Sequence, residues 1–239
     1  MELRYVAPGG TEYQLLAGSD GGPFIAAESL TGLVGVFEDT PVSVIGAPGG
    51  RVDFRDRVVK PMEGGFQLVV FTREQWAKAR RDFSTRQLGL LVLIGERRFE
   101  LPVRLSAPLP APSTVPSAGT ALDVALIADG GVWLSTGKGT GAVTVTNWGD
   151  VPVWPTIVFS GVGKVTLPSG TTIPLPSVTG EHVLDLSRGR AGTAVNVVSG
   201  SLVPVDAVAE MVPVGATRAF RTEGPVRLEW KIGVFDPWI

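Results

Sequence analysis

Hydrophobic and polar residues alternate through short segments along most of the chain. Residues 3–6 and 11–15 alternate on either side of Pro8-Gly9-Gly10, which predicts a β-hairpin. Short runs rich in valine, leucine and threonine, with glycine and proline between them, are typical of strands joined by tight turns. Further strands are predicted in this half at residues 24–30, 42–45, 50–59, 66–71, 90–94 and 97–105.

One segment follows a helical period instead. Thr72 and Gln75 have the spacing of a capping box, in which the Thr72 hydroxyl accepts from the Gln75 amide. Trp76, Ala79 and Phe83 then recur at helical spacing and make one apolar face. We expect a helix near residues 72–84, with Trp76 in the core.

A proline-rich stretch at residues 106–117 interrupts the pattern. Its four prolines remove ladder donors and favour an extended, semi-rigid spacer. We therefore predict a linker at 106–117, a first domain over residues 1–105 and a second over residues 118–239. The first domain is expected to be a β-sandwich or barrel that carries the single α-helix.

No helical period follows the linker. Predicted strands recur about every ten residues, with glycine, proline or asparagine between them, as in an antiparallel sandwich. We expect edge strands or turns at Pro152, Pro155, Pro174 and Pro176. The predicted strands are residues 122–128, 132–135, 142–147, 153–159, 163–167, 182–186, 194–198, 218–222 and 226–234.

Composition narrows the classes of protein that remain. The chain has 239 residues and is 44% hydrophobic, enough for a sizeable core. A formal net charge of −2 argues against broad attraction to nucleic acid or anionic membrane. There is no cysteine, which excludes disulfides and cysteine-based zinc sites. The longest strongly apolar run, residues 88–94, is too short to span a bilayer, and the start does not resemble a signal peptide. We expect a soluble protein assembled in the cytoplasm.

Candidate catalytic chemistry is sparse. His182 is the one histidine, and a Ser-His-Asp hydrolase would depend on it. No Gly-x-Ser-x-Gly segment is present to hold a nucleophile. The glycine-rich residues 137–141 lack the Gly-Lys-Ser/Thr ending of a phosphate loop. We expect no enzyme, no cofactor and no bound metal, and a hydrolase built on His182 stays as a third alternative.

Two groups of side chains are candidates for contacts with partners. A cationic excess lies on the predicted helix and on a nearby hairpin, and it is either a solvated face or an assembly surface. Tryptophans concentrate in the second half, where they either pack in the core, anchor a neighbouring subunit or stack on sugars. The basic candidates are Arg73, Lys78, Arg81, Arg97 and Arg98, and the aromatic candidates are Trp133, Trp148 and Trp154.

Two motifs carry a resemblance to a known family. Residues 143–161, with Asn147, Gly149 and Pro155, resemble the V-x-N-x-G-x-x-x-x-x-P-x-I-x-x-x-G segment of distal tail proteins from long, flexible-tailed bacteriophages. Residues 230–238 are similar to the closing W-x-x-G-x-x-D-P-W of tail proteins from phages that infect actinobacteria. The order of parts along the chain fits the same family of distal, or minor, tail proteins.

The resemblance implies a structural role. It implies that the first domain forms a ring, commonly of six copies, at the distal end of the virion tail, with a galectin-like β-sandwich outside it. The implied partners are further copies of the chain, the tail tube protein, the tape-measure protein, the tail-tip hub or tail-associated lysin, and receptor-binding or fibre proteins. The alternative is a carbohydrate-binding sandwich that recognises host cell-wall glycans.

Overall fold

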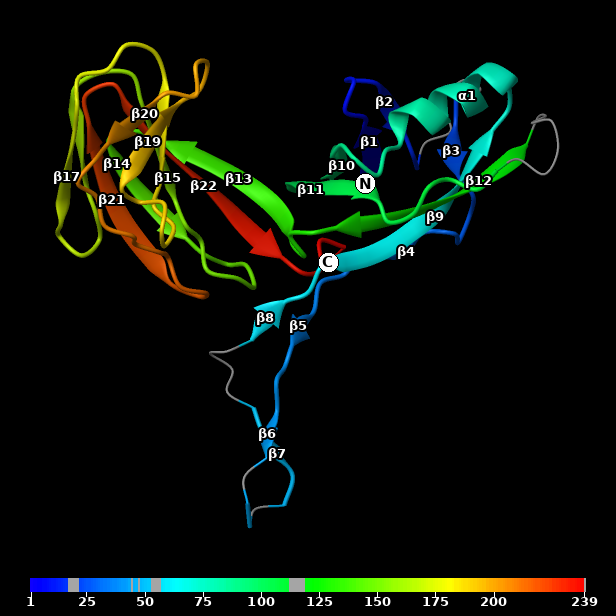
Figure 1. Ribbon diagram of the computed structural model, residues 1–239, viewed down its shortest axis with the longest axis horizontal. Coiled ribbons are helices and arrows are strands. Elements are labelled where there is room, and N and C mark those ends of the chain that lie inside the picture. Colours follow the sequence, from blue (N-terminus) through cyan, green and yellow to red (C-terminus); the bar gives the residue numbers. More distant parts are fainter. Residues whose placement is uncertain (17–21, 44, 47, 53–56, 112–118, 239) are drawn as a thin grey trace. The chain divides into compact units, whose positions relative to one another are not determined.

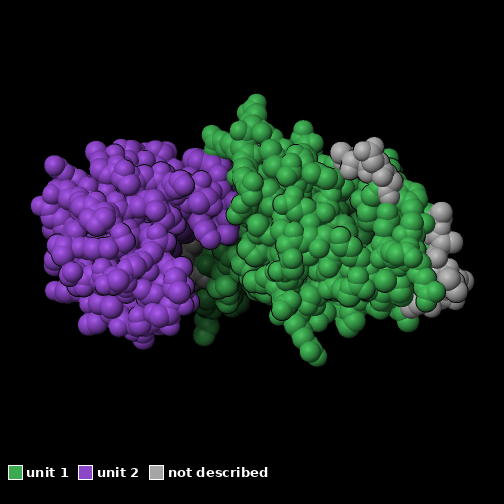
Figure 2. Space-filling model, turned by 90° about the horizontal axis from the view of Figure 1, so that it is seen from above, with its two compact units in different colours: residues 1–133, 235–239 green, residues 134–234 purple. Residues whose placement is uncertain are grey.

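The computed structural model describes the chain except for residues 17–21, 44, 47, 53–56, 112–118 and 239. All the regular elements of the described residues are β-strands except one helix, and the strand pairings are antiparallel (Figure 1), which confirms the predicted fold class. The chain divides into two compact units, coloured separately in Figure 2. Unit 1 is Met1–Trp133 with Phe235–Ile239, and unit 2 is Leu134–Val234.

Unit 1 is built on a continuous series of antiparallel strands. Their order is β2-β1-β10-β11-β12-β9, and β3 and β4 pair with β9. The longest pairing joins β9 to β12, along which buried and exposed residues alternate as the strand period requires. The bounds are β1 Glu2–Val6, β2 Glu12–Gln14, β3 Phe24–Ile25, β4 Thr31–Gly32, β9 Met62–Val70, β10 Gly89–Ile94, β11 Arg98–Leu105 and β12 Thr120–Ala128.

The predicted helix is present as α1, Arg73–Asp82. The Thr72 hydroxyl accepts from the Gln75 amide at 3.2 Å, and the Gln75 side chain accepts from the Phe71 amide at 2.8 Å, so the capping box is confirmed. Trp76 is only half-buried, contrary to the prediction, and the Arg80 guanidinium lies over its ring. Ala79 is the buried residue of the helix.

Phe83, at the C-terminal cap of α1, joins the helix to two parts of the strand series. Its ring stacks on Tyr5 of β1 at 4.2 Å and meets Phe66 of β9 edge-on at 6.2 Å. The Tyr13 hydroxyl donates to Asp82 Oδ2 at 2.5 Å, and burial together with that carboxylate raises the pKa of Tyr13. Burial, with the charge of Asp82, raises the pKa of Tyr5 to about 12.

The boundary between the units lies after Trp133, later than the sequence predicted. β12, assigned from sequence to the second domain, is instead an interior strand of unit 1 between β11 and β9. The proline-rich stretch thus connects two neighbouring strands of one unit. The carbonyls of Leu109 and Pro110 accept from Arg80 on α1, while residues 112–118 of the stretch lie outside the described residues.

The last residues of the chain return to unit 1. Phe235 packs edge-on against Phe37 at 4.8 Å, and its carbonyl accepts from the Gly35 amide at 3.0 Å. Trp238 packs edge-on against the buried Trp133 at 5.9 Å. The closing D-P-W segment therefore completes the first unit, although it follows the second in sequence.

Unit 2 is the antiparallel sandwich that the strand spacing predicted. One layer has the order β13-β22-β15-β18-β19-β20 and the other has the order β14-β21-β16-β17. Two of its strands, β17 and β20, were missed in the sequence because each carries a proline, and both are edge strands, where a missing donor is tolerated. The bounds are β13 Trp133–Gly139, β14 Ala142–Thr146, β15 Thr156–Phe159, β16 Gly163–Thr166, β17 Thr172–Leu175, β18 His182–Asp185, β19 Thr193–Asn196, β20 Leu202–Pro204, β21 Thr217–Glu223 and β22 Val226–Val234.

Asn147 explains the asparagine–glycine motif of unit 2. Its side chain is fully buried, donates to the carbonyls of Val151 and Val212 at 2.9 and 3.0 Å, and accepts from the Gly149 amide at 3.0 Å. A Cβ at Gly149 would overlap the Gly233 carbonyl, so only glycine fits this close approach to β22. The motif therefore stabilises the sandwich through the buried hydrogen bonds of Asn147.

Candidate assembly surfaces

A narrow two-stranded arm leaves the body of unit 1 (Figure 1). Its base is formed by β5, Phe37–Glu38, paired with β8, Val58–Val59. Its outer part is formed by β6, Val42–Ser43, paired with β7, Gly50–Arg51. The strands predicted at residues 42–45 and 50–59 contain β6, β7 and β8, but neither β5 nor the separation of this segment from the core was predicted.

The base of the arm is fixed to the body. Phe37 contacts Phe235, and the Arg57 guanidinium lies 5.4 Å from the Phe37 ring centroid. Ion pairs join the two strands, from Arg57 to Asp39 at 2.6 Å and from Lys60 to Glu38 at 3.4 Å. These contacts set the direction in which the arm leaves the unit.

The outer arm presents apolar side chains to solvent. Val42 is 62% exposed and Ile45 is 104% exposed. Val36 and Val58, nearer the base, are also exposed. A two-stranded ribbon is marginally stable alone in water, and clustered exposed apolar side chains mark surfaces that bind a partner. The arm is therefore the first candidate assembly surface.

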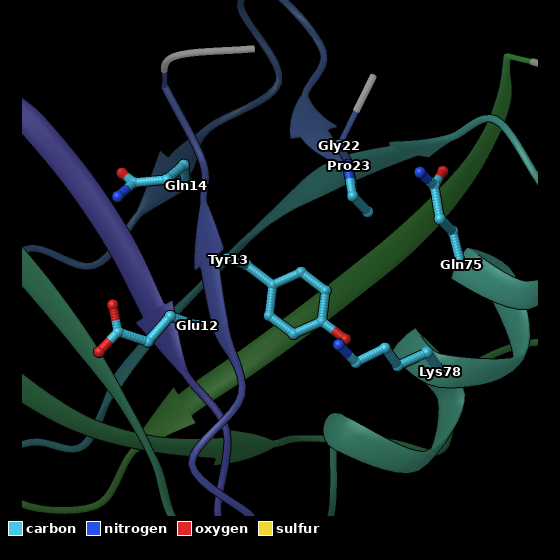
Figure 3. A pocket seen from close by; sticks show the side chains of 7 residues that line it. All are labelled: Glu12, Tyr13, Gln14, Gly22, Pro23, Gln75 and Lys78. Atoms are coloured by element: carbon cyan, nitrogen blue, oxygen red, sulfur yellow. The ribbon is translucent and has the colours of Figure 1, made fainter. Parts of the chain in front are cut away.

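A second candidate lies between α1 and strand β2. A pocket of about 310 Å³ is lined there by Glu12, Tyr13, Gln14, Gly22, Pro23, Gln75 and Lys78 (Figure 3). Lys78 reaches from α1 toward the Tyr13 ring, with Nζ 5.9 Å from its centroid. Among the described residues β2 is the end strand of its series, so the outer edge that carries Glu12 and Gln14 can receive another strand.

The predicted basic candidates do not form one patch. Arg73, Lys78 and Arg81 are exposed on α1, whereas Arg97 and Arg98 are exposed at the β10–β11 hairpin. Leu105, at the end of β11, donates to the Ser84 carbonyl just beyond the helix. Arg98 lies seven residues back along that strand, roughly 23 Å away at the usual rise per residue. The basic surface is thus divided into a helix part and a hairpin part.

The predicted aromatic platform is not assembled. Trp133 is 0% exposed and its indole N–H donates to the Leu33 carbonyl at 2.8 Å, so it cannot stack on a sugar. Trp148 is 40% exposed and Trp154 is half-buried beside the bridge between Val153 and Val212. The tryptophans that suggested a glycan site therefore have different roles, and Trp133 belongs to the core of unit 1.

The candidate catalytic residue is also structural. His182 is 3% exposed, packs against Phe159 and has Nδ1 3.1 Å from the Gly180 carbonyl. Among the residues that the structure describes, no group of histidine, aspartate or glutamate side chains could hold a metal ion. In the same residues no helix is long and apolar enough to cross a membrane.

Unit 2 has one exposed apolar hairpin of its own. Val195 of β19 and Leu202 of β20 lie opposite each other and are both exposed, as are Val197 and Val198 in the turn. This hairpin is short and belongs to the six-stranded layer, unlike the arm of unit 1.

Comparison with solved structures identifies the fold. Neither a protein-family model nor a curated protein matches the chain. The Dit protein of phage SPP1, described as a paradigm of the hub adsorption apparatus in phages that infect Gram-positive bacteria, is similar at a TM-score of 0.59 and 12% identity, over 97% of this chain and 98% of that one. Chains of the phage P2 baseplate in its activated conformation are also similar. The form with Ca matches at a TM-score of 0.55 and 9% identity over 97% and 98% of the two chains, and the form with Sr at 0.54 and 7% over 96% and 97%. The chain therefore has the Dit-like fold along nearly its whole length.

Proposed function

We propose that this protein is a structural component of a bacteriophage tail tip, which forms a ring and joins the tail tube to the baseplate or tip proteins. The observation that carries the proposal is the agreement in fold with the SPP1 Dit protein over 97% of the chain, which includes both units. A partial match would support only a shared domain. The two sequence motifs described above support the same proposal independently of the fold.

The arm gives the proposal a physical basis. A ring needs a heterologous interface, in which a surface on one copy contacts a different surface on the next. The apolar outer arm around Val42 and Ile45 and the open edge of β2 are two such different surfaces on unit 1. We therefore propose that unit 1 forms the ring and that unit 2 lies at its periphery. Six copies is the number that the resemblance implies.

The proposed setting follows from the same role. We place the protein in the virion at the distal end of the tail, after assembly in the cytoplasm of an actinobacterial host. Its proposed partners are the tail tube protein, the tape-measure protein, the tail-tip hub or lysin, and fibre or receptor-binding proteins. The role requires no catalytic step and no cofactor.

The experiment that tests the proposal is sedimentation analysis of the purified full chain over a range of concentrations, with negative-stain microscopy of the largest species. We expect a closed ring of a single copy number in equilibrium with smaller species. A strict monomer at the highest soluble concentration, both alone and with isolated tail tubes of the same phage, would contradict the proposed ring.

A further inference from the structure

A second concave site lies at the C-terminal end of α1, on a different part of unit 1 from the pocket of Figure 3. It has a volume of about 310 Å³ and is bounded by the last turn of the helix, the segment after it, and the chain that follows β11. Phe83, Leu105 and Leu109 are buried residues of its lining. Arg80, Arg81 and Arg86 bring three positive charges to it.

Contacts within the protein hold the Arg80 side chain in the site. Its Nη1 donates to the Pro110 carbonyl at 2.6 Å and its Nη2 to the Leu109 carbonyl at 3.3 Å. Its guanidinium also lies over the Trp76 ring, 5.0 Å from the centroid. A guanidinium has five N–H donors, so donors remain after these two contacts. A fixed fork of this kind loses little side-chain freedom when it binds an oxyanion.

The positive charges of the site have no carboxylate partner in its lining. The nearest acid in sequence, Asp82, accepts from the Tyr13 hydroxyl. Among the described residues, Arg81 and Arg86 form no ion pair. The helix dipole favours cations in its last turn, which accounts for Arg80 and Arg81 but not for Arg86, four residues beyond the end of α1.

The segment after the helix adds hydroxyl groups to the site. Ser84 and Thr85 both line it. Ser84 Oγ accepts from the backbone amides of Arg86 and Gln87 at 3.0 and 3.2 Å, which shapes the turn. Since the oxygen accepts in both contacts, the hydroxyl hydrogen is left to donate to a ligand.

We propose that this site binds a phosphate group. Three guanidiniums and two hydroxyls match the charge and the several acceptor oxygens of phosphate better than the single charge of a carboxylate. The net charge of −2 disfavours a long polyanion track, so the site takes one phosphate group. That group is either free phosphate or a phosphate within a nucleic-acid strand.

The test is calorimetric titration of the full chain with inorganic phosphate at constant ionic strength, with acetate as the comparison anion. The variant is R81Q/R86Q, which leaves the backbone contacts of Arg80 in place. The matched control is R97Q/R98Q, which removes the same charge from the distant β10–β11 hairpin. Displacement of a fluorescent oligothymidylate by inorganic phosphate distinguishes the two sources.

We expect saturable phosphate binding that R81Q/R86Q weakens at least about tenfold and R97Q/R98Q changes less than about twofold. Displacement of the oligonucleotide supports a nucleic-acid phosphate, and binding without displacement supports free phosphate. Equal losses in the two variants, equal affinity for acetate, or no saturable phosphate binding would each overturn the site.

Discussion

The two units bury their apolar side chains in different ways. Unit 2 is continuous in sequence, and its two layers enclose one core that runs from Val143 to Ile232. Unit 1 needs both ends of the chain and extends an apolar arm away from its core. Unit 2 thus encloses its core within one stretch of chain, whereas unit 1 leaves exposed apolar side chains on an arm that stands away from its core.

The largest expected effect is a loss of stability in unit 1, and it distinguishes the buried Trp133 from the half-exposed Trp148. Trp133→Ala should destabilise unit 1 by about 3–5 kcal/mol, because it removes a fully buried ring, its hydrogen bond to Leu33 and its contact with Trp238. The half-exposed Trp148→Ala is the comparison and should cost under about 1 kcal/mol. Hydrogen exchange read by mass spectrometry should show lost protection in β9 and β12 for Trp133→Ala. Unchanged protection there would show that Trp133 is not a core residue of unit 1.

The next effect falls on unit 2. Asn147→Ala should destabilise the sandwich by about 3 kcal/mol, since the Val151 carbonyl and the Gly149 amide lose this partner and the Val212 carbonyl keeps only the Val153 amide. Asn196→Ala, which removes contacts to the amides of Val198 and Ser199 in an exposed turn, is the control and should cost about 1 kcal/mol. Urea unfolding of both variants, followed by exchange in β15 and β22, measures the difference. An equal loss of unfolding free energy in the two variants would contradict the stabilising role assigned to Asn147.

A smaller expected effect is a difference between the two units in how their stability depends on pH. Both tyrosines of the chain lie in unit 1, and burial raises the pKa of Tyr5 from an ordinary 10 to about 12. A raised folded-state pKa contributes stability that is complete below pH 10 and is lost as pH rises to about 12. Unit 1 should therefore loosen over this window while unit 2, which has no tyrosine, changes less.

The measurement for this prediction is phenolate absorbance with exchange protection at each pH. Tyr5→Phe, which cannot ionise, should flatten the pH dependence of unit 1. Phenolate signal that rises near pH 10 without loss of protection would contradict the burial of these rings.

Sequence and structure agree where local signals are strong. The capping box of Thr72 and Gln75 predicts α1, and the spacing of the second half predicts the sandwich. The boundary was misplaced because proline content marks where a ladder cannot form, and cannot tell a linker between units from a connection between neighbouring strands. The return of Phe235 and Trp238 to unit 1 depends on contacts between residues more than a hundred positions apart in sequence, which no local pattern encodes.

The surfaces show the same limit. Side-chain type predicted a basic surface and an aromatic platform. The length of β11 separates the basic residues of the hairpin from those of the helix, and the burial of Trp133 removes one tryptophan from the platform. The arm was visible only as two strands around a turn, because periodicity does not report whether a hairpin packs on the core. Deletion of residues 118–239 would remove β12 from unit 1, so it would not isolate an intact first unit.

The smallest expected effect on folding comes from substitutions that ask whether unit 1 carries the self-association of the chain. Val42→Ser/Ile45→Ser on the arm and Val195→Ser/Leu202→Ser on the hairpin of unit 2 remove exposed apolar groups of similar kind, and each pair should change stability by under about 0.5 kcal/mol. Sedimentation of both variants beside the unaltered chain then reports which unit carries self-association. The proposed role of the arm predicts that the arm variant sediments as a monomer and that the hairpin variant still forms the ring. A ring that survives the arm substitutions and dissolves with the hairpin substitutions would contradict it.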